Sequence, residues 1–163
     1  MCCKAYQTRL RLETDGTNVN GSRIEPGVRP VDRKSQKELR RPPSPDIVLL
    51  AAEWQPRALI RAQLIEDGFN VVATNTWPMM RRQLRPGMKP QLAIVDLKEL
   101  PDPRGVLNDL RVLMKPEKVL VLTAAGTVSP ADIGRLGFRA LSRPIIIEHV
   151  VRAAAESFRA RKG

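Results

Sequence analysis

The fold is decided by a short apolar run that ends in a carboxylate, Leu92-Ala93-Ile94-Val95-Asp96. A continuous apolar run of this length is typical of a strand that helices cover on both faces of a parallel sheet. Three other runs have the same character, and small or polar residues follow each of them. They are Ile47-Val48-Leu49-Leu50 before Ala51-Ala52-Glu53, Val119-Leu120-Val121-Leu122 before Thr123, and Ala140-Leu141-Ser142 before Arg143-Pro144.

Helical patterns alternate with the strands from Asp46 onward. Strands are predicted at 46–51, 69–73, 92–95, 118–122 and 138–141, and helices at 56–67, 75–86, 104–114, 129–136 and 146–159. The apolar side chains expected to pack against the sheet are Leu59, Ile60 and Leu64 in the first helix and Val106, Leu107, Leu110 and Leu113 in the third. Short connections between five β-α units predict an α/β fold with a parallel sheet and helices on both faces.

The hydrophobic character of the strands favours a flavodoxin-like, doubly wound (βα)5 sheet with strand order 2-1-3-4-5. In such sheets, ligands bind beyond the carboxyl ends of the strands, at the switch point between the first and third strands. Ala51, Ala52, Glu53 and Asp96 are all expected at that point.

The first 45 residues form a separate segment. They contain several prolines and glycines and many charges, with almost no apolar periodicity, so they bury too little surface to offset the entropy of ordering. We predict a disordered basic extension over 1–45 and one folded domain over 46–163. The same composition also fits a start codon assigned too far upstream.

Charge and cysteine content indicate which partners and which cellular compartment the chain suits. The formal net charge is +11, which favours contact with polyanions or acidic proteins. The only cysteines, Cys2 and Cys3, lie outside the folded part, as expected in a reducing cytosol. No apolar run has the roughly 18 residues of a membrane span. We therefore expect a cytoplasmic protein that makes no membrane contact.

The residues at the strand ends resemble the receiver domain of bacterial two-component response regulators. Asp96, followed by Pro101 and Gly105, matches the phosphoacceptor region with one extra residue, and Thr123-Ala124 matches the switch hydroxyl that ends the fourth strand. Arg143-Pro144 stands in place of Lys-Pro, and Gly68-Phe69 matches the glycine-aromatic pair. The resemblance covers residues 46 to about 160 and implies phosphorelay signal transduction, as in other members of the CheY-like superfamily.

The chain departs from that family at the first strand. Receivers hold a divalent ion with a pair of acids there, and Ala51 and Ala52 occupy these positions. Magnesium prefers carboxylate oxygens, and its charge is what stabilises phosphoryl transfer to a carboxylate. Only Glu53, one residue later, could join Asp96 in a rescued Mg²⁺ site. The sequence therefore predicts a stand-alone pseudo-receiver with no metal or other cofactor and no enzymatic activity.

Asp96 has two interpretations at this stage. It is either a phosphoacceptor whose state Thr123 reports by reorienting, or a crevice carboxylate that forms a structural pair with Arg143. The loss of the acid pair favours the second interpretation.

The expected activity is binding to a protein partner: a histidine kinase, another regulator, or a second copy in a homodimer. By resemblance, the partner face maps to about 129–160, where Ile146, Val150 and Val151 add apolar character. Two alternatives stay open, a working phosphoacceptor that uses Asp96 with Glu53, and a basic module that contacts nucleic acid through residues 1–45. The sequence shows no helix-turn-helix after the receiver-like part, which argues against specific DNA binding.

Overall fold

The structure is a computed structural model, and it describes residues 44–159. Of the predicted extension over 1–45, all but Ser44 and Pro45 lies outside the described residues, as do 160–163 at the other end.

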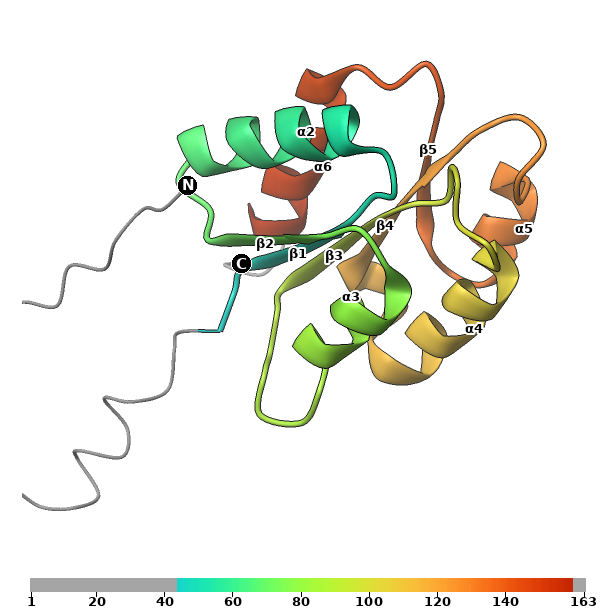
Figure 1. The fold of residues 1–163 in the computed structure, drawn as a ribbon, viewed down its shortest axis with the longest axis horizontal. Helices are drawn as coiled ribbons and strands as arrows, with labels where there is room; N and C mark the ends of the chain where they lie inside the picture. Colours follow the sequence, from blue (N-terminus) through green and yellow to red (C-terminus); the bar gives the residue numbers. More distant parts are fainter. Residues whose placement is uncertain (1–43, 160–163) are drawn as a thin grey trace, which may run out of the picture. The chain divides into compact units, whose positions relative to one another are not determined.

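Five parallel strands form one sheet in the order β2-β1-β3-β4-β5 (Figure 1). Their bounds are β1 Ile47–Leu50, β2 Val71–Thr74, β3 Leu92–Asp96, β4 Val119–Thr123 and β5 Arg139–Ser142. This is the predicted flavodoxin-like, doubly wound order, and β1 lies between β2 and β3 with its residues in register with both. The sequence-based fold prediction is confirmed.

Alternate residues of the strands divide the core into two layers. Val48 and Leu50 of β1 belong to one apolar cluster, whereas Ile47 and Leu49 belong to the other. β3 and β4 alternate in the same way, because successive side chains of a strand point to opposite faces. The central strands are therefore buried on both faces, and they are apolar at every position except Asp96 and Thr123, which end β3 and β4.

Helices cover both faces of the sheet (Figure 1). The elements are α2 Trp54–Glu66, α3 Trp77–Gln83, α4 Pro103–Leu113, α5 Pro130–Arg135 and α6 Ile147–Arg159, with a short 3-10 helix, η1 Pro116–Lys118, before β4. α2 and α6 pack on one face, and α3, α4 and α5 pack on the other. None of the described helices has both the length and the apolar character that crossing a membrane requires.

Local capping explains where two of the helices begin. The side chain of Asp102 accepts a hydrogen bond from the backbone N–H of Gly105 (2.9 Å), and Pro103 occupies the first helical position of α4. Ser129 caps α5 in the same manner, by accepting from the N–H of Asp132 (3.1 Å).

Two of the helix packing predictions are wrong. Leu59 of α2 and Leu113 at the end of α4 are exposed, whereas Ile60 and Leu64 of α2 are buried as predicted. α2 carries apolar residues on more than one side, so the spacing alone did not show which side contacts the sheet. Leu113 is the last residue of α4 and is 38 % exposed, whereas Leu110, one turn earlier, is fully buried.

Candidate functional site

Four charged side chains meet at the carboxyl edge of the sheet. Glu53 follows β1, Asp96 ends β3, Lys98 lies in the loop after β3, and Arg143 follows β5. We call these four residues the ion network. The sequence predicts three of them at this edge, and the structure brings those three together. The fourth, Lys98, was not predicted.

Asp96 is the buried centre of the ion network. Its side chain is 1 % exposed, and each of its oxygens has a partner. Nη2 of Arg143 donates to Oδ2 (2.5 Å), and the backbone N–H of Lys98 donates to Oδ1 (3.1 Å). A carboxylate at this depth is costly unless it is paired and hydrogen-bonded, and here it is both. The predicted contact between Asp96 and Arg143 is confirmed.

Glu53 faces both cations of the network. Its Oε1 lies 2.5 Å from Nζ of Lys98, and its Oε2 lies 3.6 Å from Nη2 of Arg143. Arg143 therefore lies close to both carboxylates, whereas the ammonium group of Lys98 pairs with Glu53. Two acids and two bases make the network formally neutral.

Arg143 reaches Asp96 across the intervening strand. Its backbone N–H donates to the carbonyl oxygen of Thr123 (2.9 Å), which fixes the residue beside the end of β4. Neighbouring strands lie about 4.8 Å apart, so β5 and β3 are separated by about 10 Å, a span that a long side chain can cross. The Arg143 side chain is 24 % exposed, and its Nε is buried with no hydrogen-bond partner among the described residues.

The two carboxyl groups respond to this environment in opposite directions. Burial raises the pKa of Asp96 above its ordinary value, although the Lys98 N–H and the Arg143 charge act against that rise. The hydrogen bond from Lys98 lowers the pKa of Glu53, and the charges of Lys98 and Arg143 act in the same direction. Glu53 is therefore the more readily ionised of the two acids.

Ala51 and Ala52 have no polar side-chain atoms, and their backbone carbonyl oxygens already have a partner. Nη1 of Arg57 donates to the carbonyl oxygens of Ala51 (2.6 Å) and Ala52 (2.9 Å). The same nitrogen lies 3.4 Å from the carbonyl oxygen of Glu53. Arg57, on the first turn of α2, thus fixes the segment that precedes the ion network.

The residues at this edge do not fit the magnesium ion that the receiver resemblance implies. Mg²⁺ needs several oxygen ligands in near-octahedral geometry. The side chains offer two carboxylates, Glu53 and Asp96, and the cationic groups of Lys98 and Arg143 hold the oxygens that such an ion would need. Within residues 44–159, no group of three or more histidine, cysteine or acidic side chains could hold a metal ion.

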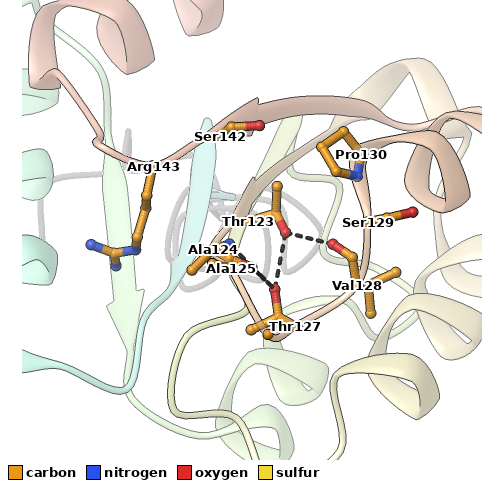
Figure 2. Close-up of a pocket in the computed structure, with 10 residues that line it drawn as sticks. Thr123, Ala124, Ala125, Thr127, Val128, Ser129, Pro130, Ser142 and Arg143 are labelled. Carbon is orange, nitrogen blue, oxygen red and sulfur yellow. Dashed lines mark hydrogen bonds between the residues drawn. The ribbon is translucent and has the colours of Figure 1, made fainter.

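Thr123 makes its hydrogen bonds within the loop between β4 and α5. Its hydroxyl donates to the carbonyl oxygen of Val128 (2.6 Å) and lies 3.0 Å from the hydroxyl of Thr127. A cavity of about 290 Å³ beside this loop is also lined by Ser142 and Arg143. Figure 2 shows the Arg143 side chain extending away from the Thr123 hydroxyl. Thr123 is thus linked to the ion network by the backbone of Arg143.

The predicted partner face needs a correction. Val150 and Val151 are 0 % and 7 % exposed, because they pack against the α2 side of the core, so they offer little to a partner. The third residue, Ile146, precedes α6 and is 49 % exposed. A helix that covers a sheet needs apolar side chains on the face that contacts the sheet. Val150 and Val151 serve the core in this way.

Sequence reasoning missed Lys98 and Arg57. Lys98 lies two residues beyond Asp96 in a polar loop, where a lysine is unremarkable. A signal was nevertheless present: in the order 2-1-3-4-5 the first and third strands are neighbours, so residues that follow them must lie close together. Glu53 and Lys98 follow β1 and β3, and their opposite charges favour a pair.

No family model matches the chain, and no curated protein matches it in sequence. Solved structures of receiver domains are similar to it. A response regulator receiver domain protein from Clostridium thermocellum is 20% identical, with a TM-score of 0.59, over 71% of this chain and 95% of that one. A response regulator receiver protein from Sinorhizobium medicae is 19% identical, with a TM-score of 0.60, over 72% of this chain and 97% of that one.

The signal receiver domain of a Vibrio parahaemolyticus protein is 25% identical, with a TM-score of 0.61, over 73% of this chain and 93% of that one. Each match spans nearly the whole of the solved domain and a share of this chain close to that of residues 44–159. Together with the strand order and the residues at the strand ends, these likenesses identify the fold: the chain folds as a response regulator receiver domain.

Proposed function

We propose that the chain is a receiver-like signalling domain of the two-component type that acts by binding a protein partner, without metal-dependent phosphorylation. The observation that carries the proposal is the ion network, in which Lys98 and Arg143 hold the oxygens of both carboxylates. Asp96 is its central member, and the pair positions that would complete a metal site are Ala51 and Ala52.

The chemistry of phosphoryl transfer explains why this arrangement matters. An acceptor carboxylate needs a free oxygen for attack and a cation that spreads the charge of the transferred group. Both oxygens of Asp96 already accept hydrogen bonds, one from Arg143 and one from the Lys98 backbone. A divalent ion would have to displace the cationic side chains and would gain only two carboxylate ligands.

The outer side of α2 supports the protein-binding part of the proposal. Trp54, Ala58, Ala62 and Ile65 are exposed and recur at helical spacing on one side. Trp54 is 73 % exposed, which is unusual for the largest apolar side chain. Contiguous exposed apolar surface marks interaction sites, and tryptophan is enriched among residues that dominate binding energy. The partner classes that fit a receiver-like domain are a histidine kinase, another regulator, or a second copy.

Intact-mass measurement after incubation with acetyl phosphate and MgCl₂ tests the proposal. We expect no phosphoryl adduct on the full chain at neutral pH. An adduct that disappears in Asp96→Asn would overturn the proposal in favour of a working phosphoacceptor that uses Asp96 with Glu53.

A gain-of-site variant provides the matched control. Ala52→Asp combined with Lys98→Ala restores one acid of the pair and removes the competing ammonium group. We expect this variant to bind Mg²⁺ in a titration followed by tryptophan fluorescence, because Trp54 lies next to Glu53. The native chain should show no saturable response to millimolar Mg²⁺. A response of the native chain equal to that of the variant would contradict the proposal.

A further inference from the structure

A groove separate from the ion network lies between the start of α3 and the start of α4. Its volume is about 550 Å³, which is within the range of sites that bind small ligands or short peptide segments. Its apolar surface comes mainly from Trp77 and Pro78 on one side and Leu100, Pro101 and Val106 on the other. Figure 1 shows α3 and α4 side by side on one face of the sheet.

The rim of this groove is acidic although the chain is strongly basic. Its lining includes Glu99, Asp102 and Asp109, with no lysine or arginine, in a chain of net charge +11. Within the described residues, Glu99 and Asp102 form no ion pair, and Asp109 has only a distant one, 4.0 Å from the exposed Arg81. The groove therefore combines apolar walls with three carboxylates, of which only Asp109 has an ion pair among the described residues.

Two details show that the groove is held in a defined shape. Nε1 of Trp77 donates to Oδ2 of Asp109 (3.0 Å), so the indole is fixed against α4. Glu99 has a φ of 59°, a left-handed conformation that is unfavourable for a residue other than glycine. Strained residues of this kind cluster at ligand-binding sites.

We propose that this groove binds an arginine-bearing peptide segment of a partner protein. The guanidinium group lies over the indole of Trp77 and pairs with Glu99 and Asp109, and a neighbouring apolar residue packs on Leu100 and Pro101. Arginine fits better than lysine because its flat, weakly hydrated cation stacks on aromatic rings and forms two parallel hydrogen bonds with a carboxylate. The proposal goes beyond the proposed function and does not depend on the chemistry of Asp96.

The groove shares two backbone segments with the ion network. Ala52 lines the groove and precedes Glu53, and Glu99 lines it and follows Lys98. A peptide seated in the groove would therefore contact residues adjacent to the Glu53–Lys98 pair. Occupancy of the groove can in this way be sensed at the edge where Asp96 and Arg143 meet.

The two tryptophans of the chain make a direct test possible. In the full-length Trp54→Phe variant, Trp77 is the only tryptophan and reports the groove. The probe is acetyl-leucyl-arginyl-leucyl-arginine amide, and its glutamine analogue is the uncharged control. We expect a saturable change in Trp77 emission with the arginine peptide, at least fivefold weaker binding of the glutamine peptide, and loss of affinity with added salt.

Charge-neutral variants locate the binding site. Glu99→Gln combined with Asp109→Asn should weaken arginine-peptide binding at least fivefold, because both negative charges are lost. The amide oxygen of the asparagine still accepts the hydrogen bond from Trp77, so the shape of the groove is kept. Glu148→Gln removes one negative charge from the exposed surface of α6, the same change in charge as Glu99→Gln alone, and should leave the affinity unchanged. Glu99→Gln alone, at an exposed loop position, covers the case in which the double variant is poorly folded.

Four outcomes overturn the proposal. They are no change in Trp77 emission at millimolar peptide, equal binding of the glutamine peptide, an equal effect of Glu148→Gln, and binding of agmatine as tight as that of the peptide. The last outcome would mean a site for a small organic cation. None of them bears on the acetyl phosphate result, so this proposal and the proposed function fail separately.

Discussion

Nη2 of Arg143 lies 2.5 Å from Oδ2 of Asp96, although Asp96 ends β3 and Arg143 follows β5, two strands that are separated by β4. A pair this short between a buried carboxylate and a mostly buried guanidinium makes each residue dependent on the other. Removal of one partner leaves an uncompensated charge in the crevice.

The first prediction concerns this dependence. Asp96→Asn and Arg143→Gln should each lower the free energy of unfolding, by about 2–3 kcal/mol, which is less than for a fully buried pair because Arg143 retains contact with solvent. The double variant should lose less than the two single losses combined, by about 1–2 kcal/mol. Urea denaturation of the four proteins measures this coupling, and strictly additive losses would contradict it.

The second prediction concerns pH and Asp96. Because the folded-state pKa of Asp96 is raised, the folded state holds this proton more tightly than the unfolded state does. The contribution of Asp96 to stability should therefore fall as pH rises from its ordinary pKa of about 3.9 to the raised folded-state value. The advantage of the native chain over Asp96→Asn in free energy of unfolding should shrink over that window and stay constant above it. An advantage that grows with pH over the same window would contradict the prediction.

The third prediction is the reverse trend at Glu53. Its folded-state pKa is lowered, so the stability that it contributes is present above its ordinary pKa of about 4.3 and is lost as pH falls through the folded value. The advantage of the native chain over Glu53→Gln should grow with rising pH in the acidic range. Urea denaturation of the native chain and the two variants at a series of pH values measures both trends. Parallel trends for Glu53 and Asp96 would rule out pKa shifts in opposite directions.

The fourth prediction concerns the loop that holds Thr123. Thr123→Val keeps the shape of the side chain but leaves the carbonyl of Val128 without its donor, which should cost about 1–3 kcal/mol. Thr123→Ser keeps the hydroxyl and should cost less. Thermal unfolding of both variants makes the comparison, and similar losses would mean that the methyl group matters more than the hydrogen bond.

The fifth prediction separates core from surface on α6. Val150→Ala should lower the free energy of unfolding by about 1–3 kcal/mol, because it opens a cavity in the core beneath α6. Ile146→Ala, at an exposed position, should change it by less than about 0.5 kcal/mol. Equal losses in chemical denaturation would place Ile146 in the core as well.

The fold was predictable because the strand signal is local. β3 and β4 are apolar at almost every position, and only a strand covered on both faces uses such a run. Helix faces were less predictable, because α2 carries Leu59, Ile60 and Ile65 on different sides, and only contact with β1 and α6 selects the buried one. Val150 and Val151 were misjudged for the same reason: from sequence alone, apolar residues that serve the core look like residues that serve a partner.

The candidate site was predictable in outline and not in its electrostatics. The strand order places Glu53, Asp96 and Arg143 at one edge, and the pair of Asp96 with Arg143 follows from their charges. The role of Lys98 depends on the path of the loop after β3, where the backbone N–H turns toward Asp96 and the side chain turns toward Glu53. The groove beside Trp77 likewise depends on the distance between α3 and α4, which sequence spacing does not encode.

The passage of Arg143 over β4 has a consequence for local unfolding. β5 is an edge strand that is hydrogen-bonded only to β4, and such strands usually open first and exchange their amide hydrogens fastest. Because Arg143 continues directly from β5 and holds Asp96 of β3, β5 cannot detach without also separating that pair. Slow hydrogen exchange at the sheet edge would then depend on a side chain two strands away in the centre of the sheet.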